Sequence, residues 1–519
     1  MSELERALEH HKAGRLQEAE AIYRDILERD PAQANAWFLL GMIAHDLGQY
    51  QNAVALIECA IERKPDVAVY RNALGDAFTA MGEHDRAIRA YEQACSRDPQ
   101  YAEAHNGRGV TLHALGRLDE AIDAFRAAAA SQAGFVAGHF NLGNALHEAG
   151  RTEEAVSAYS KAVELAPNDA EIWNNLGIAL KDANRVDEAL GAFDRALALQ
   201  PEFAGVHMNK GMALLVLGRF EEGWKEYRWR FSAMTAGASE ETVNDAPPLW
   251  DGSNFSGKTL LVRTEQGRGD AIQFIRFLPM VQALGGRVVL ACDPILHRLI
   301  ADCPGADDVI QDTRPSVSGA RPDLRVSLLD LPGLLGTRID NIPDRVPYIK
   351  VDSALVEDWR KRITEKGFNV GLCWAGLPEH RNDRNRSMPL SVFAPLARVA
   401  GVSFYSLQKG AAAAQAEQPP AGMKLIDVST QLNDFADTAA LISHMDLVIS
   451  VDTAVAHLAG ALGRPVWTLL PYAPDWRWLL EREDSPWYPT MRLFRQPRIG
   501  DWQSVMEQVA ANLQILVRN

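Results

Sequence analysis

A short glycine-containing turn carries the first residue types that could do chemistry. Gly267 and Gly269 flank an arginine and lead into Asp270, after the apolar run 259–265 and before the helical stretch 271–285. Backbone N–H groups in a turn between strand and helix can hold a phosphate or another oxyanion. The Asp270 carboxylate can act there as a general base, or it can simply be an acid that the helix dipole favours. The pattern indicates an anion-binding turn beside a candidate base.

A second strand-to-helix junction points to a diphosphate site. An apolar run ends at Asp452 and passes through Thr453 directly into a helix that begins at Ala454. The first-turn N–H groups, the Thr453 hydroxyl and the helix dipole would all favour an anion at that end of the helix. His457 lies one helical turn after Thr453, on the same helix face. A helix cap followed by a packed histidine is the structural alternative.

An arginine-rich loop supplies positive charge. It follows the apolar run 369–376 and contains Arg381, Arg384 and Arg386. In an acidic protein, guanidinium groups gathered after a strand are better explained by an anionic ligand than by solubility. We therefore expect this loop to close over phosphates.

Several other kinds of site are not indicated. The chain has no HExxH segment, no convincing D-x-D motif and no Walker loop, so we expect neither a metal nor a cofactor. The glycine turn matches part of a dinucleotide fingerprint, with Asp293 placed to bind a ribose. However, Ile272 stands where a third glycine belongs. An NAD site is a minor alternative.

The elements that must position these residues alternate between strand and helix. After residue 256, short apolar runs alternate with helical stretches, which is typical of α/β domains with parallel sheets. The runs that we expect to form strands are 259–265, 287–293, 369–376, 402–408, 446–452 and 465–471. We assign residues 257–350 to one Rossmann-like lobe and residues 351–519 to a second. Such lobes bind ligands at the carboxyl ends of their strands, so we expect the chemistry between the lobes.

The first 231 residues follow a repeat of 34 residues. Glycine recurs at this step, alanine and a large apolar residue recur in the same register, and proline usually closes the unit. Small residues let two helices cross closely, and proline stops the second helix. The repeat glycines are Gly41, Gly75, Gly109, Gly143, Gly177 and Gly211. The pattern resembles the tetratricopeptide repeat and predicts an all-α superhelix of six to seven helix pairs over residues 1–231.

Such superhelices present a concave groove that usually binds a peptide. The last three repeats carry Asn141, Asn175 and Asn209, each two residues before the repeat glycine. Asparagine amides both donate to and accept from a peptide backbone, so this ladder could hold an extended chain without reading its side chains. It resembles the asparagine ladder of the O-GlcNAc transferases, although asparagine also occurs at this position in repeats without that function. A protein is therefore the partner expected in the groove.

The end of the repeats marks a domain boundary. Trp224, Tyr227, Trp229 and Phe231 crowd the last unit, which predicts either a simple cap or a junction with the next domain. Residues 232–256 are rich in small, polar and proline residues and predict a linker.

Composition restricts the function classes. The chain has 519 residues, 47% of them hydrophobic, which suits several globular folding units. Its net charge of −15 argues against nucleic acid as a partner. The five cysteines form no paired motif, and no apolar run is long enough to span a membrane. The N-terminal segment lacks the features of a signal peptide, so we expect a cytoplasmic location.

Taken together, the segments around Asp270, Arg386 and Asp452 resemble the bacterial heptosyltransferase superfamily, whose members are inverting, metal-independent glycosyltransferases of the GT-B fold. The similarity spans about residues 257–500. It is closest to bacterial proteins that join tetratricopeptide repeats to such a domain, as in O-GlcNAc transferases and flagellin glycosyltransferases. The resemblance implies that Asp270 is the catalytic base, that Arg386 neutralises the donor phosphate, and that Asp452 with Thr453 binds the donor sugar and diphosphate.

The resemblance also implies a wider set of residues at the donor site. The candidate donor and nucleotide ligands are Gly267, Gly269, Arg386, Gln408, Lys409, Asp452, Thr453, Ala454 and His457. Heptosyltransferases usually carry Gly where Ala454 stands and commonly carry Lys where Arg386 stands. Both departures leave phosphate binding intact, but the Cβ of Ala454 narrows the pocket and leaves the sugar undetermined.

The sequence thus predicts an inverting, metal-independent glycosyltransferase that moves a sugar from a nucleotide donor to a Ser or Thr hydroxyl of a protein held by the repeats. Flagellin is one candidate acceptor. A transferase that acts on a carbohydrate or a lipid-linked acceptor is the first alternative. The second is a non-catalytic scaffold with a degenerate transferase domain, against which the retained Asp270, Arg386 and Thr453 argue.

Overall fold

The computed structural model describes residues 2–235, 247–312, 322–365, 367–380 and 382–518. Part of the predicted linker and the whole of Arg381 therefore lie outside the described residues. The chain forms two compact units, Met1–Glu202 and Phe203–Asn519. The 34-residue repeat continues to residue 231, so the boundary between the units lies one helix pair before the end of the repeats. The reason is that this last pair packs into the α/β lobes that follow it.

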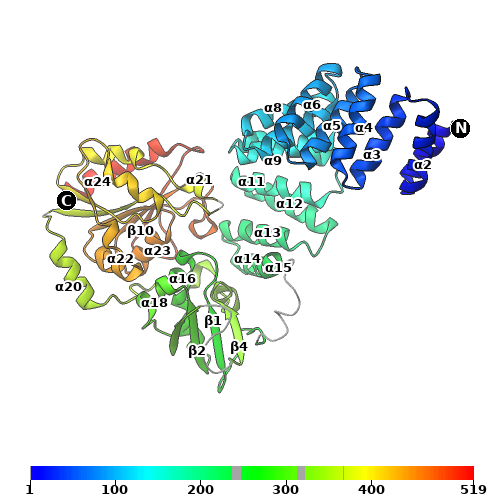
Figure 1. Ribbon diagram of the computed structural model, residues 1–519. Helices are drawn as coiled ribbons and strands as arrows, with labels where there is room; N and C mark the ends of the chain where they lie inside the picture. The colour runs from blue at the N-terminus through cyan, green and yellow to red at the C-terminus, as the bar shows by residue number, and fades with distance from the viewer. Residues whose placement is uncertain (1, 236–246, 313–321, 366, 381, 519) are drawn as a thin grey trace. The chain divides into compact units, whose positions relative to one another are not determined.

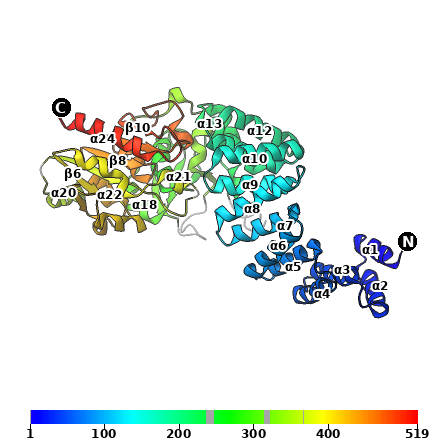
Figure 2. The ribbon, with the colours of Figure 1, turned by 90° about the horizontal axis from the view of Figure 1, so that it is seen from above.

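The first unit is a superhelix in which each helix packs on its neighbours in sequence (Figure 1; Figure 2). Its described helices are α1 (Glu3–Lys12), α2 (Leu16–Arg29), α3 (Ala34–Asp46), α4 (Tyr50–Arg63), α5 (Ala68–Ala80), α6 (His84–Arg97), α7 (Ala102–Ala114), α8 (Leu118–Ser131), α9 (Val136–Glu148), α10 (Thr152–Leu165), α11 (Ala170–Asp182) and α12 (Val186–Leu199). The predicted all-α repeat array is confirmed.

Close helix crossing explains the glycine of each repeat. A Cβ at Gly75 would lie 2.6 Å from the ring of Tyr91, and a Cβ at Gly109 would lie 2.6 Å from the ring of Phe125. These distances are far inside van der Waals contact, so the two helices of a pair can approach this closely only with glycine there. A second glycine, Gly82 with a φ of 73°, ends the first helix of its pair in the left-handed conformation.

The second unit opens with the helices α13 (Ala204–Val216), α14 (Phe220–Tyr227) and α15 (Arg230–Thr235). Two lobes follow, each built on a parallel sheet, as predicted (Figure 1). The first lobe has the strand order β3-β2-β1-β4. Its elements are β1 (Thr259–Arg263), α16 (Arg268–Phe274), η2 (Ile275–Phe277), α17 (Leu278–Gln282), β2 (Arg287–Cys292), α18 (Pro294–Ile300), β3 (Asp308–Gln311), β4 (Leu324–Ser327), η3 (Leu328–Asp330), α19 (Leu331–Leu334) and η4 (Ile339–Asn341), where η marks a 3-10 helix.

The second lobe has the strand order β10-β9-β8-β5-β6-β7. Its elements are α20 (Ser353–Arg362), β5 (Phe368–Cys373), α21 (Asp383–Arg386), η5 (Leu390–Arg398), β6 (Val402–Ser406), η6 (Ala411–Glu417), β7 (Leu425–Asp427), η7 (Ser429–Gln431), α22 (Phe435–Ile442), β8 (Leu447–Val451), α23 (Ala454–Ala461), β9 (Val466–Leu470), η8 (Trp476–Trp478), β10 (Met491–Arg495) and α24 (Trp502–Arg518).

The aromatic cluster at the end of the repeats is a junction. The indole N–H of Trp224 donates to the carbonyl of Thr337 at 3.0 Å, and its ring meets Trp476 edge-on with centroids 5.2 Å apart. Arg230, whose side chain is fully buried, pairs with Asp330 at 2.8 Å. A buried charge of this kind is stable only when it is paired. The last helix pair is therefore part of the core that supports both lobes.

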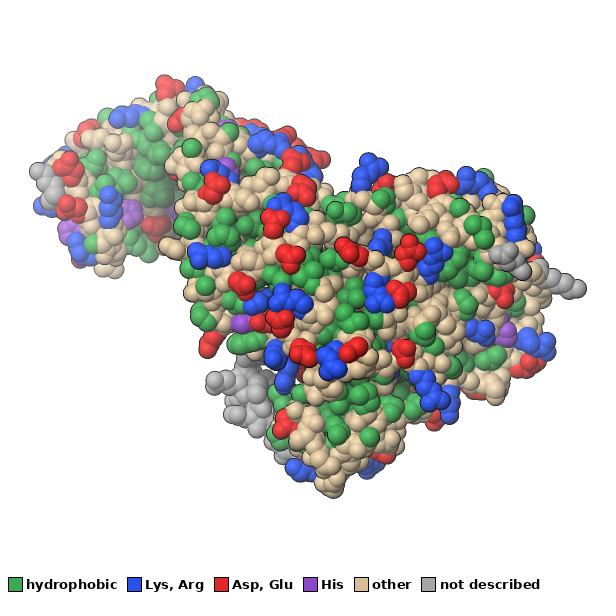
Figure 3. Space-filling view, turned by 180° about the vertical axis from the view of Figure 1, so that it is seen from behind, with side chains coloured by type: hydrophobic (Ala, Val, Ile, Leu, Met, Phe, Trp, Pro, Cys, Tyr) green, Lys and Arg blue, Asp and Glu red, His purple; other side chains and the backbone are tan. Residues whose placement is uncertain are grey.

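One face of the molecule carries mixed charge. On the face that Figure 3 shows, acidic and basic side chains are interspersed. Within the described residues, no helix is both long enough and apolar enough to cross a membrane.

Candidate active site

Asp270 lies in the first turn of α16, where the first lobe meets the second. Its Oδ2 accepts from the backbone N–H of Gly267 at 2.8 Å, and its Oδ1 pairs with Nη2 of Arg477 at 2.5 Å. Burial raises the pKa of the Asp270 carboxyl above its ordinary value, and the Arg477 guanidinium opposes part of that rise. The carboxylate is held in one orientation with enhanced basicity, which is what a general base requires.

The start of α23 faces the start of α16. The Thr453 hydroxyl makes no cap bond to the helix and instead lies 3.0 Å from Oγ of Ser450. The first-turn N–H groups of α23 are among those that a helix leaves without intrahelical acceptors. Together with the positive end of the helix dipole they form a site that favours an anion.

Arg386 reaches the same place from α21. Its Nη1 donates to the backbone carbonyl of Asp452 at 3.0 Å, and its Nε lies 3.4 Å from Asp383. A Cβ at Gly376 would lie 2.6 Å from Nη2 of Arg386, so the loop after β5 passes directly against the guanidinium. The structure thus brings Arg386, Asp452 and the start of α23 together, and their binding of a donor phosphate remains a prediction.

Gly269 and His457 form a close contact between the two lobes. A Cβ at Gly269 would lie 2.8 Å from the His457 ring and 3.4 Å from Cα of Ala454. The ring itself packs on Trp478 and its Nδ1 lies 3.0 Å from the hydroxyl of Tyr488. Burial lowers the pKa of His457 well below its ordinary value, so the ring is neutral. His457 acts as a wedge that sets the distance between α16 and α23.

We expect Gly269→Ala to force these helices apart. Added volume in a packed contact typically costs about 1–3 kcal/mol, and here the displaced helix carries Asp270. The melting temperature and the turnover number should both fall. Gly191→Ala is the matched control, because nothing lies within 4 Å of a Cβ at that position in α12. The control should be neutral or slightly stabilising. An unchanged melting temperature in Gly269→Ala would contradict the contact.

Asp452 is a buried acid directly after β8. It is 9% exposed, and burial, followed by the charge of Asp475, raises the pKa of its carboxyl to about 6 from an ordinary 3.8. Its Oδ1 lies 4.0 Å from Nε2 of His457. Because the folded protein holds this proton more tightly than the unfolded chain does, ionisation of Asp452 lowers the free energy of unfolding as the pH rises from about 4 to about 6.

We therefore expect Asp452→Asn to be more stable than the wild type at pH 8 and no more stable at pH 4. The pKa difference corresponds to about 3 kcal/mol at pH 8. Urea titrations at the two pH values, followed by tryptophan fluorescence, measure the difference. A pH-independent effect would show that the ionised carboxyl is not the destabilising group. The same variant should bind a sugar nucleotide less tightly.

Gln408 and Lys409 follow β6, which ends at Ser406, and their side chains are engaged with backbone groups. Oε1 of Gln408 accepts from the N–H groups of Trp374 and Ala375 at 3.0 and 2.9 Å. Nζ of Lys409 donates to the carbonyl of Ser429 at 2.8 Å. Gln408 thus fixes the loop after β5, and contact of either residue with a nucleotide remains a prediction.

The predicted asparagine ladder is divided between the two units. In the first unit, Nδ2 of Asn141 donates to Asn106 at 2.8 Å and Nδ2 of Asn175 donates to Asn144 at 3.3 Å. Asn209 belongs to the second unit and is buried. The amides of the first unit hold neighbouring repeats in register, and a peptide-binding role for the three residues remains a prediction.

Asp293 does not favour the dinucleotide alternative. Its carboxylate caps α18 by accepting from the N–H of Ile295 at 3.0 Å, and it pairs with Arg268 at 3.0 Å. Both interactions explain the acid without a ribose. Within the described parts of the chain, His, Cys, Asp and Glu side chains form no group of three that could hold a metal ion.

Sequence reasoning missed the segment that follows β9. Asp475, at the start of this segment, accepts from Nη1 of Arg477 at 2.8 Å, and both residues stand beside Asp270. His380 lies near the same charged groups. Burial lowers the pKa of its imidazole, and the positive charge of Arg386 lowers it further. The available signal was a dense run of tryptophan and arginine directly after the carboxyl end of a parallel strand.

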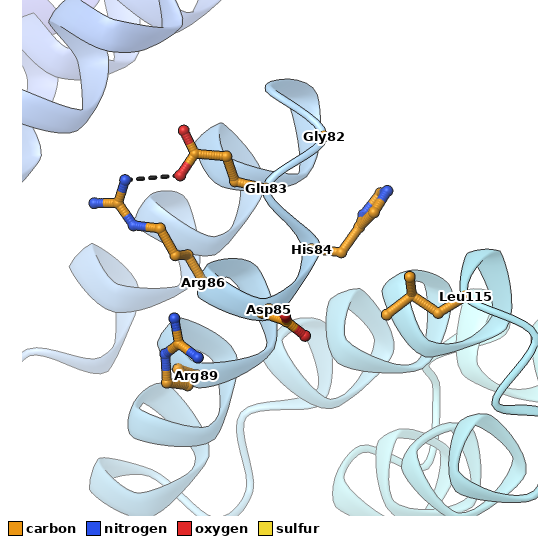
Figure 4. A pocket seen from close by; sticks show the side chains of 7 residues that line it. All are labelled: Gly82, Glu83, His84, Asp85, Arg86, Arg89 and Leu115. Carbon is orange, nitrogen blue, oxygen red and sulfur yellow. Dashed lines mark hydrogen bonds and ion pairs between the residues drawn. The ribbon is translucent and has the colours of Figure 1, made fainter.

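A separate hollow of about 430 Å³ lies in the first unit, at the start of α6 (Figure 4). Its lining includes His84, Leu115 and the ion pair of Glu83 with Arg86, whose atoms are 2.7 Å apart. It shares no residue with the predicted donor site.

Comparisons with known proteins match both parts of the chain. The model of glycosyltransferase family 9 (heptosyltransferase) matches residues 394–489, which include the strand-to-helix junction at Asp452 and the segment with Arg477. Tetratricopeptide repeat models match residues 4–68, 72–135, 143–183 and 174–228. Asp270 and Arg386 lie outside the matched parts.

Among curated proteins, Protein FlbA of Caulobacter vibrioides is 30% identical over 322 residues, which are 57% of this chain and 53% of that protein. The chain thus matches about half the length of this relative. Among solved structures, MamA is 25% identical and covers 32% of this chain and 96% of its own, with a TM-score of 0.29. PilF of Pseudomonas aeruginosa is 20% identical and covers 41% of this chain and 95% of its own, with a TM-score of 0.35. The chain thus joins segments that match tetratricopeptide repeat models to a segment that matches the model of glycosyltransferase family 9 (heptosyltransferase).

Proposed function

We propose that the protein is an inverting, metal-independent glycosyltransferase that transfers a sugar from a nucleotide donor to a Ser or Thr hydroxyl of a protein bound by the repeats. The observation that carries the proposal is the meeting of two helix starts from different lobes. One start presents the carboxylate of Asp270, and the other, with Arg386 beside it, favours an anion.

The chemistry that this arrangement supports needs no metal. Asp270 takes the proton of the acceptor hydroxyl while its oxygen forms a bond to the anomeric carbon of the sugar. The bond from that carbon to the nucleotide phosphate breaks, and the electron pair leaves with the phosphate. Arg386 and the first-turn N–H groups of α23 stabilise the negative charge that develops there. Attack from the side opposite the leaving group inverts the anomeric configuration.

The acceptor is proposed from the repeats. Superhelices of this kind present their inner helices to extended chains. The polar inner side chains that include Asn141 and Asn175 suit a peptide backbone, whose N–H and carbonyl groups recur along any sequence. A bacterial surface protein such as flagellin is one acceptor of this kind. Asp452 and Thr453 would hold the sugar and diphosphate, and Gln408 and Lys409 would lie near the nucleoside.

A panel of nucleotides tests the donor half of the proposal. Thermal unfolding is measured with UDP, GDP, ADP, CDP, CMP and NAD, each at high excess. A ligand at 100 times its dissociation constant stabilises the folded state by about 2.7 kcal/mol, which is readily measured. We expect one nucleoside diphosphate or CMP to raise the melting temperature.

Arg398→Ala serves as the matched control for Arg386→Ala, because Arg398 forms an exposed ion pair with Glu507 at the surface. The shift should persist in Arg398→Ala and vanish in Arg386→Ala. A shift with NAD alone would overturn the proposal in favour of a dinucleotide site. If none of UDP, GDP, ADP, CDP and CMP raised the melting temperature, the result would support a non-catalytic scaffold.

A further inference from the structure

One buried side chain of the second lobe contacts the candidate base of the first lobe. Arg477 is 5% exposed. Its Nη2 lies 2.5 Å from Asp270, its Nε donates to Oε1 of Gln273 at 2.7 Å, and its Nη1 lies 2.8 Å from Asp475. Each of its three nitrogen atoms is thus engaged with an acceptor of the protein. A guanidinium held in this way is not placed to bind a donor phosphate.

Aromatic rings fix the plane of this guanidinium. Its carbon lies 4.2 Å from the ring centre of Trp476 and 5.4 Å from that of Phe274. Trp476 in turn packs edge-on against Trp224 of the last helix pair. Stacking together with contacts to three separate acceptors needs arginine in particular, because lysine offers neither a planar group nor a fork of donors.

An arginine of the first lobe makes the same kind of contact with the second lobe. Arg276, which follows α16, is 6% exposed, and its Nη1 donates to the carbonyl of Trp487 in the second lobe at 2.5 Å. Its Nη2 donates to the hydroxyl of Tyr348 at 2.8 Å. Each lobe therefore buries one arginine in the other. Separating the lobes would take Asp270 and Gln273 away from Arg477, and it would take the Trp487 carbonyl away from Arg276. Loss of these partners favours the arrangement in which the lobes are in contact.

We infer that Arg477 is a positioning residue that orients the Asp270 carboxylate toward the acceptor, so that the base is completed only when the two lobes are in contact. This inference rests on the proposed function, because it gives Asp270 the role of base. Arg477 acts through Asp270 and does not itself touch substrate.

The charges around Asp270 make the inference measurable. Its pKa is affected by Arg477, which lowers it, by Asp475, which raises it, and by His380, which lowers it. Tyr227 also faces the carboxylate but is neutral, since burial raises the pKa of its hydroxyl to about 12. Arg477 is the cation in direct contact. Its removal should therefore release the carboxylate and make it less acidic.

The test follows the titration of Asp270 by NMR on full-length protein whose aspartate carboxyls are labelled with carbon-13. The Asp270 signal is assigned by its absence in Asp270→Asn. We expect its pKa to rise by about one to three pH units in Arg477→Gln. The rise should be smaller in Arg477→Lys. Asp475→Asn, which leaves Arg477 in place, should move the pKa in the opposite direction and covers the case in which an Arg477 variant fails to fold.

Arg298→Gln is the control for general weakening of the interface between the lobes. Arg298 of α18 pairs with Asp434 at the surface, 2.8 Å away, and is 53% exposed. Its replacement should leave the Asp270 titration unchanged. If Asp270 titrates alike in the wild type, Arg477→Gln and Asp475→Asn, the inference is wrong.

Turnover separates positioning from a purely structural brace. Release of nucleotide from a mixture of UDP-, GDP-, ADP- and CMP-sugars is measured against pH, with the protein acceptor present. If Arg477 positions the base, Arg477→Gln should lose at least about tenfold in kcat with little change in the KM for the donor. The part of the pH–rate profile that reports ionisation of the base should shift by the same amount as the NMR titration. Arg477→Lys should partly restore the rate. If Arg477 only stabilises the interface between the lobes, the variant should have a raised KM and an unchanged pH–rate profile. The NMR titration needs neither the donor nor the acceptor. A nucleotide panel without any shift would therefore contradict the proposed function, whereas an unchanged Asp270 titration would contradict this inference alone.

Discussion

We expect Asp270→Asn to lower turnover by about 10²- to 10⁴-fold while nucleotide binding is retained. The amide keeps the shape of the side chain and can still accept from the N–H of Gly267, but it cannot take a proton from an acceptor hydroxyl. The positive end of the site, formed by Arg386 and the start of α23, is untouched. The measurement compares kcat for sugar transfer with the thermal shift that the same nucleotide produces.

Asp352→Asn is a suitable control for this variant. Asp352 also stands at a helix start, where its carboxylate accepts from the N–H of Ala354 at 2.8 Å, but it caps α20. Loss of a charged cap should cost about 1 kcal/mol of stability and leave kcat unchanged. Equal rates in Asp270→Asn and the wild type would mean that Asp270 is only a favoured acid at a helix start.

The second large effect is expected at Arg386. Arg386→Ala removes a charge-assisted donor to the leaving phosphate and also the donor to the Asp452 carbonyl. We expect nucleotide affinity to fall by about 10- to 100-fold, as loss of a hydrogen bond to a charged group does. The rate at saturating donor should fall further, because the charge on the phosphate grows in the transition state. Calorimetric titration and steady-state rates measure the two effects separately.

Arg386→Lys distinguishes charge from shape at this position. Lysine keeps the charge but not the planar fork, so binding should be partly restored. If Arg386→Ala bound nucleotide as tightly as the wild type, the anion site at the start of α23 would have to lie elsewhere.

The sequence predicted the central strands of both sheets and missed the four at the edges. The core strands β1, β2, β5, β6, β8 and β9 are covered on both faces, so they read as continuous apolar runs. The missed strands β3, β4, β7 and β10 each lie at the edge of a sheet. Edge strands are short and mix polar with apolar residues, which makes their periodicity weak.

The candidate site shows the same division. Asp270, Asp452 and Arg386 could be found because each follows a strand, and parallel strands gather their carboxyl ends at one edge. Arg477 could not, because its partners Asp270 and Gln273 lie more than two hundred residues away in sequence. Nor does the repeat period reveal that the last helix pair joins the second unit. The placement of this helix pair depends on the contact between Trp224 and Trp476, which no local sequence pattern predicts.

The measurement that tests the central claim most directly is the fate of the transferred sugar. An extract of the cells that make the protein is incubated with the protein and a radiolabelled sugar of the nucleotide class that the panel identifies, with Asp270→Asn in parallel. The account predicts that label enters protein, resists lipid extraction and polysaccharide digestion, is released by mild alkali as expected of Ser- and Thr-linked sugar, and is absent with Asp270→Asn. Label found only in lipid or polysaccharide would contradict it.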